Sequence, residues 1–180
     1  MKKIIFSIIF TLNIFFVFYL ITPLPQIPDL ANSQKSDLPG DTTQQKNISG
    51  YFTNLSRTEV ITFYKANLNG PFRIQLNHPP EKSKQIIGDT TQSYYLEEFV
   101  FPFKGSVFIN GFDWQKDVFT RPEKRIANKL YYHDVEYQSK ITVKSFPTSL
   151  LQRIIFFVLG ETILFLIYFS YRKFVIMRHE

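Results

Sequence analysis

Few side chains in this sequence have the chemistry of a catalytic or metal-binding site. The candidates are His78, Asp89, Glu97, Glu98, His133 and Asp134, and none follows a recognised ligand spacing. Glu97 and Glu98 are adjacent in a segment with strand character, so their side chains point to opposite faces and cannot share a proton. The chain has no cysteine, which excludes disulfides, zinc–thiolate sites and a cysteine nucleophile.

The two histidines of this group have structural interpretations. His133 alternates with Tyr131 and Val135, where we expect a hydrogen-bonded, partly buried histidine on a sheet face. His78 precedes Pro79 and Pro80, a run that is typical of a turn entering a helix. The sequence also has no glycine-rich phosphate loop, nucleophile elbow or His-Glu-x-x-His pair. We therefore expect a protein that is not an enzyme and that holds no metal or cofactor.

Glu161 has the most unusual position of the ionisable residues, because it interrupts an otherwise uncharged apolar run from Ile154 to Tyr171. A second apolar run, Ile4 to Thr22, lies near the start of the chain. Each run is long enough to cross a bilayer as a helix. The sequence predicts transmembrane helices over residues 4–22 and 150–171, with an ionisable side chain inside the hydrocarbon.

The environment of Glu161 has several open interpretations. At about 1.5 Å per residue, Glu161 lies about 15 Å from the end of its run and Asn13 about 14 Å from the start of the other. A protonated carboxylic acid and a carboxamide at one depth can exchange hydrogen bonds, and Gly160 would let the helices approach closely. Alternatively, Glu161 contacts a basic side chain of a partner protein or a second copy, lines a proton path, or is protonated and tolerated in lipid.

Basic residues at the chain ends predict the orientation of these helices. Lys2 and Lys3 precede the first run, and three more follow the second: Arg172, Lys173 and Arg178. Arg153, at the outer end of the second run, opposes the same orientation. The positive-inside rule places residues 1–3 and 172–180 in the cytoplasm and the central segment outside the inner membrane of a cell.

The first run also has features of a cleaved signal peptide, with Ala31-Asn32-Ser33 as a candidate cleavage site. Its apolar core exceeds the usual length of a signal core. Pro23, Pro25 and Pro28 also separate that core from the candidate site. We therefore favour an uncleaved membrane anchor.

The formal net charge of +6 is dispersed along the chain. Between the apolar runs, Lys124 and Arg125 form the only adjacent basic pair. A nucleic-acid-binding surface requires basic residues gathered on one face or stripe. We expect no nucleic-acid partner.

Between the apolar runs, the sequence predicts a flexible linker followed by one small domain. Residues 23–48 are rich in Pro, Gln, Ser, Asp and Thr, a composition typical of disorder. Residues 49–147 carry enough apolar side chains for one core. Within them, Ser56-Arg57-Thr58-Glu59 is a capping box, and the apolar spacing behind it predicts a helix from Arg57 to Leu68.

Alternating segments predict a small antiparallel sheet with one or two helices. Lys104-Gly105 indicates a turn, Asn110-Gly111 is a hairpin signal, and Pro79-Pro80 is expected to start a short helix that ends at Gly88. The fold class is therefore α+β, flanked by two transmembrane helices. The predicted strands are Phe72–Leu76, Tyr94–Phe101, Ser106–Trp114 and a long segment Tyr131–Val143, which is one strand or two joined by a bend.

Trp114, Tyr94 and Tyr95 are candidates for a surface that stacks against a glycan or peptide. A small domain rich in aromatic residues also uses them in its core, and we favour that interpretation.

Three segments carry a resemblance to other proteins: Ser56–Leu68 with its Phe63-Tyr64 pair, His78-Pro79-Pro80-Glu81, and Ser106–Phe112. The resemblance that they carry extends over about a third of the chain. The sequence resembles uncharacterised membrane-anchored proteins predicted from bacterial genomes. The resemblance implies an extracytoplasmic bacterial domain and no particular mechanism.

From these features we expect a non-catalytic subunit or scaffold of a cell-envelope complex. Its transmembrane helices would contact the bilayer and a protein partner or a second copy of the chain. The alternative is a membrane-anchored binding module for an envelope glycan or peptide.

Overall fold

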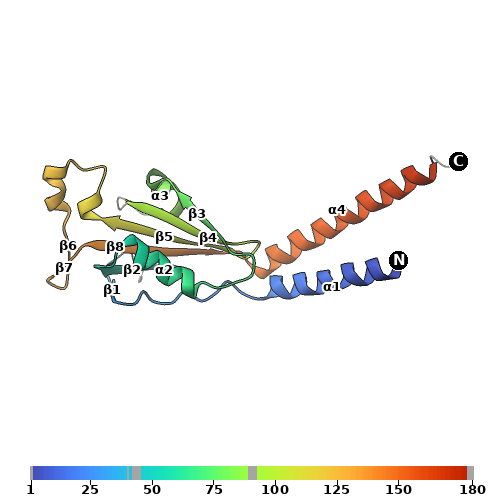
Figure 1. Cartoon of the computed structure of the whole chain (residues 1–180), viewed down its shortest axis with the longest axis horizontal. Helices are drawn as coiled ribbons and strands as arrows, with labels where there is room; N and C mark the ends of the chain where they lie inside the picture. Colours follow the sequence, from blue (N-terminus) through green and yellow to red (C-terminus); the bar gives the residue numbers. More distant parts are fainter. Residues whose placement is uncertain (1, 40, 42–45, 89–92, 178–180) are drawn as a thin grey trace. The chain divides into compact units, whose positions relative to one another are not determined.

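The computed structural model describes residues 2–39, 41, 46–88 and 93–177 (Figure 1). Asp89, one of the candidate acidic residues, lies outside the described residues. The chain divides into two compact units. One combines residues 1–23 with 148–180, and the other is residues 24–147.

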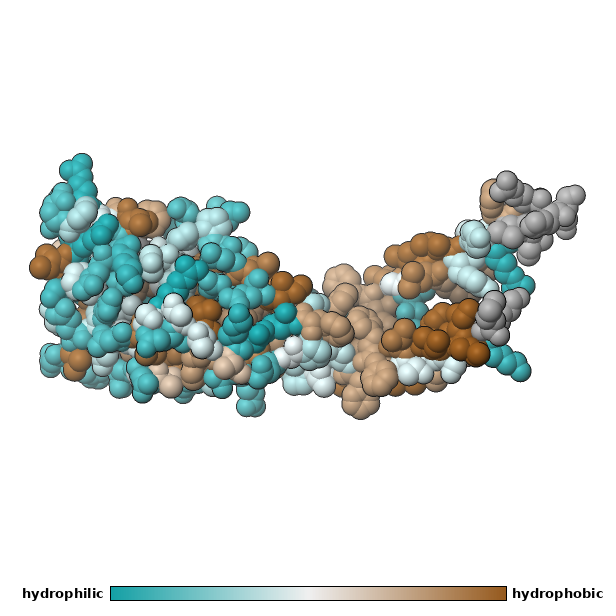
Figure 2. All heavy atoms as spheres, viewed as in Figure 1, coloured by the Kyte–Doolittle hydropathy of each residue, from teal (hydrophilic) through white to brown (hydrophobic). Residues whose placement is uncertain are grey.

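The first unit consists of two helices, α1 (Lys2–Ile21) and α4 (Leu150–Met177). Their segments Lys3–Ile21 and Leu150–Phe174 are long and apolar enough to cross a membrane. Most of their large apolar side chains are exposed, and Figure 2 colours much of both helices as hydrophobic. Such an all-round apolar surface is typical of helices that face lipid.

The second unit is built on a six-stranded sheet in the order β1-β2-β8-β5-β4-β3. All five neighbouring pairs are antiparallel, which confirms the predicted α+β class with an antiparallel sheet. A separate two-stranded hairpin consists of β6 (Leu130–Tyr132) and β7 (Val135–Tyr137). The strands of the large sheet are β1 (Ser33–Lys35), β2 (Ile48–Thr53), β3 (Ile74–His78), β4 (Tyr95–Phe101), β5 (Gly105–Asp113) and β8 (Ser139–Pro147).

One helix covers each face of the sheet (Figure 1). Helix α2 (Arg57–Asn67) begins with the predicted capping box of Ser56 and Glu59. Its buried face packs on the main core with the inward side chains of four strands. The short helix α3 (Ser83–Ile87) follows the turn Pro80–Lys82 and ends at Gly88, as predicted, and covers the other face near Leu96 and Phe108. Two further turns of 3₁₀ helix, Trp114–Lys116 and Pro122–Asn128, connect β5 to β6.

The prediction of a flexible linker over residues 23–48 is wrong for much of that segment. Leu24 and Ile27 pack against the main core, and Leu30 is buried within it. Ser33–Lys35 forms the edge strand β1 and pairs with β2. The segment is mostly polar, but Leu24, Ile27 and Leu30 are apolar and follow one another at intervals of three residues. Their contacts with the core hold the segment on the domain.

The Asn110-Gly111 hairpin prediction is also wrong, because both residues lie inside β5. Gly111 pairs with Tyr95 on β4, whose ring lies over it. A side chain at Gly111 would occupy the space of that ring. The turn predicted at Lys104-Gly105 is confirmed, with the Lys104 N–H donating to the Phe101 carbonyl at 2.9 Å.

The strand predicted at Phe72–Leu76 is shifted by two residues, to Ile74–His78. The alternation of this segment is typical of a half-buried strand, and its apolar residues Ile74 and Leu76 are 50% and 42% exposed. The physical reason is that β3 is an edge strand, so one of its long sides has no neighbouring strand to shield it.

The long alternating segment Tyr131–Val143 is broken into three strands, not one or two. His133 and Asp134 both have positive φ angles, of 48° and 62°, and form the tight turn between β6 and β7. The His133 side chain is 64% exposed, so the expectation of a partly buried sheet histidine is wrong. Two successive left-handed residues reverse the chain, and alternation alone does not reveal such a turn.

Candidate functional site

The candidate site is a hollow of about 300 Å³ at the end of the edge strand β3. It combines aromatic, basic and amide side chains with two prolines, so it offers both stacking surfaces and hydrogen-bonding groups. Tyr94 and Tyr95, candidates for a ligand surface although a core position was favoured, both line it, and Tyr95 also belongs to the main core. The lining residues are Arg57, Asn77, His78, Pro79, Pro80, Tyr94 and Tyr95.

Trp114, the third residue predicted for this surface, is not among the residues that line the hollow. The Lys129 ammonium lies 5.3 Å from the centre of its indole ring. Lys116 makes a similar contact with Tyr94, at 5.4 Å. A cation over an aromatic face is a stabilising contact, so Trp114 belongs to the packing of the 3₁₀ turns after β5.

Tyr95 forms the buried wall of the hollow. Its side chain is 3% exposed, and the Arg57 guanidinium lies 5.1 Å from its ring centre. Burial raises the pKa of the Tyr95 phenol, so the hydroxyl stays protonated at physiological pH. Among the described residues, that hydroxyl is buried without a hydrogen-bond partner. A neutral phenol of this kind can donate or accept a hydrogen bond.

Arg57 is held at the site by Glu97 on β4, which is itself bonded by Gln75 on β3. Its guanidinium pairs with the Glu97 carboxylate, whose side chain is 7% exposed. The Gln75 amide donates to the other oxygen of Glu97 at 3.1 Å. The sequence predicted that Arg57 begins a helix, but it did not reveal the contact with Glu97. That contact depends on how α2 packs across β4. The pair fixes the guanidinium over Tyr95 with most of its charge neutralised.

His78 and Glu98 form a second polar pair, on the opposite face of the sheet. His78 Nε2 lies 2.6 Å from Glu98 Oε2, and both side chains are mostly buried. The register of β3 with β4 sets His78 opposite Leu96, which makes Glu98 its diagonal neighbour. Glu97 and Glu98 thus bond different partners on opposite faces, as the alternation predicted.

The described residues of this arrangement orient an imidazole and offer hydrogen-bonding and stacking groups to a ligand. Among the described residues that line the hollow beside His78, there is no serine, threonine or lysine. In the described part of the chain, no three His, Asp or Glu side chains gather closely enough to hold a metal ion. The chemistry available is hydrogen bonding and aromatic stacking.

The residues predicted for contacts within the membrane lie on α1 and α4. Asn13 donates its side-chain amide to the Ile9 carbonyl of its own helix at 3.1 Å. Glu161 is exposed on α4, and the Cβ position of Gly160 has no atom within 4 Å. The pairing of Asn13 with Glu161 therefore stays a prediction.

Arg153 joins the two helices, and the sequence analysis missed this role. Its side chain is 5% exposed and donates to the Leu20 and Thr22 carbonyls at 3.1 and 2.9 Å. It also donates to the Thr148 carbonyl at 2.7 Å. A cation is favourable at the carbonyl end of a helix, so Arg153 caps the last turn of α1. The available signal was a single arginine at the N-terminal end of an apolar run.

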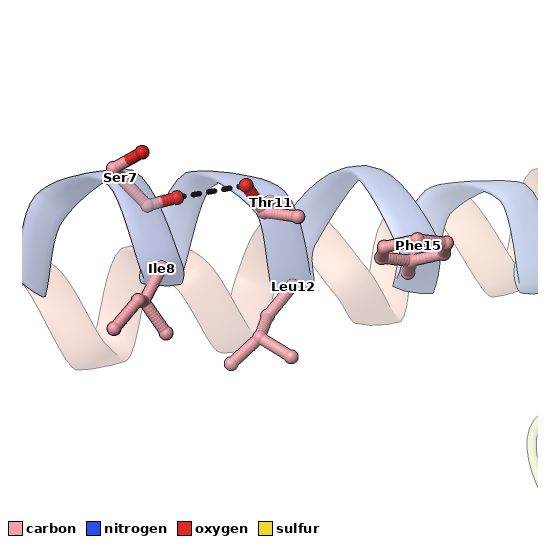
Figure 3. A pocket seen from close by; sticks show the side chains of 5 residues that line it. All are labelled: Ser7, Ile8, Thr11, Leu12 and Phe15. Atoms are coloured by element: carbon pink, nitrogen blue, oxygen red, sulfur yellow. Dashed lines mark hydrogen bonds between the residues drawn. The ribbon is translucent and has the colours of Figure 1, made fainter. Parts of the chain in front are cut away.

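A shallow hollow of about 220 Å³ lies along α1 (Figure 3). It is lined by Ser7, Ile8, Thr11, Leu12 and Phe15. The Thr11 hydroxyl donates to the Ser7 carbonyl at 2.9 Å, so it bonds its own helix. Small hydroxyl residues four apart on an apolar helix are typical of surfaces where membrane helices pack.

No protein-family model matches the sequence, and no match is found among curated proteins or among solved structures. The interpretation of the site therefore depends on its own geometry and chemistry.

Proposed function

We propose that this chain is a non-catalytic subunit of a bacterial cell-envelope complex, anchored in the inner membrane by α1 and α4. Both termini would lie in the cytoplasm and the sheet unit outside. The single observation that carries the proposal is Glu161, an exposed ionisable residue near the middle of the apolar segment Leu150–Phe174. An ionisable side chain within hydrocarbon is costly and needs a polar contact.

The hydrogen bonding of α1 favours a contact outside this chain. Asn13 uses its amide on the Ile9 carbonyl, and the helices meet through Arg153 and through a ring contact of Phe16 with Phe157 at 5.8 Å. The hollow on α1 that contains Ser7 and Thr11 offers a surface for a further helix. Glu161 would then hydrogen-bond a polar side chain of a partner protein or a second copy.

The contacts of Arg153 support the proposed orientation. The positive-inside rule concerns basic residues that must stay on the cytoplasmic side, and Arg153 was the residue that opposed it. Its guanidinium is buried among backbone carbonyls of α1 and Thr148. A structural role explains why this basic residue is present at the outer end of α4.

The proposal is tested by crosslinking in native membranes followed by mass spectrometry, comparing wild type with Glu161→Gln and Glu161→Leu. We expect one protein, or a second copy, to be captured by wild type and retained by Glu161→Gln, which keeps hydrogen bonding. Capture should fall roughly tenfold in Glu161→Leu, because an interhelical hydrogen bond in lipid contributes about 1–2 kcal/mol.

Thr162→Leu is the matched control, because Thr162 is also an exposed polar residue of α4 but donates to the Val158 carbonyl of its own helix. It should leave capture unchanged. Identical capture by wild type and Glu161→Leu would overturn the proposal.

A second candidate function is a binding module for an envelope glycan or peptide, favoured by the hollow around Tyr94 and Tyr95. The test is retention of fragmented peptidoglycan by the full-length protein in detergent. Tyr94→Ala should lower retention about threefold to tenfold, because an aromatic stacking contact contributes about 0.5–1.5 kcal/mol. Tyr131→Ala, an exposed tyrosine that does not line the hollow, is the control. Equal retention by the two variants would exclude this function.

A further inference from the structure

One end of the sheet carries an apolar row on a single face. The strand registers set Ile74 opposite Val100, Val100 opposite Ser106, and Ser106 opposite Phe146. Directly opposed residues in antiparallel strands share a face, so these four side chains form one row across β3, β4, β5 and β8. Ile74 is 50% exposed and Phe146 is 41% exposed, although both are large apolar residues.

Two turns at the same end of the sheet hold phenylalanines outward. Phe103 lies in the turn between β4 and β5, and Phe72 lies two residues before β3. They are 52% and 72% exposed, and both have positive φ angles, of 64° and 63°. A left-handed conformation is unfavourable for a bulky residue and clusters at functional sites. Phe72, Ile74, Phe103 and Phe146 are hereafter the aromatic rim.

The chain connects this end of the sheet to the apolar helix α4. Gly105, at the β4–β5 turn, pairs with Pro147 at the end of β8. Only Thr148 and Ser149 separate Pro147 from Leu150, the first residue of α4. Three extended residue steps span at most about 11 Å. The aromatic rim is therefore tied to the start of a candidate membrane span.

The charges beside the rim suit a phospholipid surface. Arg73 lies between Phe72 and Ile74, and Lys144 lies two residues before Phe146. Both donate to backbone carbonyls, and the ion pairs among the described residues include neither of them. No Asp or Glu occurs within two residues of any rim residue. Apolar side chains with basic neighbours are the composition of segments that lie in a membrane interface.

We propose that the aromatic rim inserts into the interface of the same bilayer that α4 crosses, so that the sheet unit contacts lipid directly. This inference rests on the membrane anchoring in the proposed function. It goes beyond that function because it assigns a lipid-binding surface to the sheet unit. Docking by a protein partner or a second copy is the competing outcome.

The test uses full-length protein in bilayer nanodiscs of phosphatidylcholine, with and without bromine atoms on the acyl chains. The bromine lies near the headgroup in one preparation and near the chain ends in another, so that both interfacial and deeply inserted tryptophans are detected. Bromine quenches tryptophan fluorescence only at close range. Trp114, the single native tryptophan, is first replaced by phenylalanine, and one tryptophan is then introduced by Phe72→Trp or Phe103→Trp. We expect both to have blue-shifted emission and to show roughly half or more of the quenching of a span residue, because aromatic rings anchor at the interface.

Two control positions distinguish lipid contact by the aromatic rim from membrane insertion of α4. Phe165→Trp, within α4, reports whether the helix crosses the bilayer at all, and its quenching is required by the proposed function. Tyr131→Trp, on the hairpin connected to the far ends of β5 and β8, should not be quenched. Quenching at Phe165→Trp without quenching at either rim position overturns the lipid contact and leaves the anchor intact. Blue-shifted rim emission that bromine does not quench assigns the rim to a protein contact and also overturns the inference.

Discussion

Asp41→Asn is expected to lower the free energy of unfolding by about 3 to 5 kcal/mol, the usual cost of removing one partner of a buried ion pair. Asp41 Oδ1 lies 2.9 Å from Lys140 Nζ, and the two side chains are only 9% and 15% exposed. The Ser36 hydroxyl donates to the other carboxylate oxygen. Asparagine keeps the shape of aspartate but leaves the Lys140 charge without its counter-charge in a mostly dry position.

The effect is measured by urea unfolding of the full-length protein in a nonionic detergent, followed by Trp114 fluorescence. Trp114 lies in the sheet unit, so its signal follows that unit. Asp29→Asn is the matched control, because Asp29 pairs with Lys35 at 2.7 Å but the two side chains are 65% and 44% exposed. An exposed pair contributes at most about 1 kcal/mol. Equal losses in the two variants would show that the Asp41 pair is not effectively buried.

The double variant Asp41→Asn with Lys140→Met distinguishes the loss of stability caused by an unpaired charge from the loss caused by altered packing. Removing both charges leaves no uncompensated ion, so most of the lost stability should return. A double variant that is as unstable as the sum of the single variants would assign the effect to packing and not to charge. The backbone at Gly50 packs closely against Asp41, since a Cβ there would lie 2.9 Å from the Asp41 carboxyl carbon.

The elements predicted correctly from sequence are those whose signals are local. The capping box at Ser56 and Glu59 and the apolar spacing behind it specify α2 without any distant contact. The two apolar helices follow from length and composition alone. The turn at Lys104-Gly105 also follows from its own residues, because Gly105 has a φ angle of 130° that other residues rarely adopt.

The predictions that failed depend on contacts between distant segments. Residues 24–35 are held in place by apolar contacts with a core that is formed by strands farther along the sequence. The turn at His133 depends on Phe52, whose ring stacks on Tyr132 at 4.6 Å and contacts Tyr137 at 5.9 Å. A single sequence does not reveal such partners, so composition and alternation gave the wrong local structure there.

Two tyrosines of the candidate site were predicted from the sequence, but its other residues and its geometry were not. Tyr94 and Tyr95 were recognised as aromatic candidates, and both line the hollow. His78 was interpreted as a turn residue, and its pairing with Glu98 required the register of β3 with β4. Arg153 was noted only as a charge that opposed the predicted orientation, since its partners are 131 and 133 residues away in sequence.

Gly111→Ala is expected to lower the free energy of unfolding by about 3 kcal/mol, the upper part of the usual range for overpacking a core. A Cβ at Gly111 would lie 2.1 Å from Cε1 of Tyr95 and 2.2 Å from its Cζ. The ring has little freedom to move, because it is 3% exposed and lies beneath the Arg57 guanidinium. The same displacement should disturb the hollow, so ligand retention should fall together with stability.

Two variants test whether space, and not backbone conformation, is the reason for glycine at this position. Gly160→Ala makes the same change where no atom lies within 4 Å of the new Cβ, and we expect no loss of stability. Combining Gly111→Ala with Tyr95→Leu removes the clashing ring atoms, so the double variant should be more stable than the sum of the single effects predicts. Strictly additive losses would instead indicate a backbone requirement at Gly111. Such a requirement is expected at Gly88, where φ is 70° and the nearest atom to a new Cβ is 3.8 Å away.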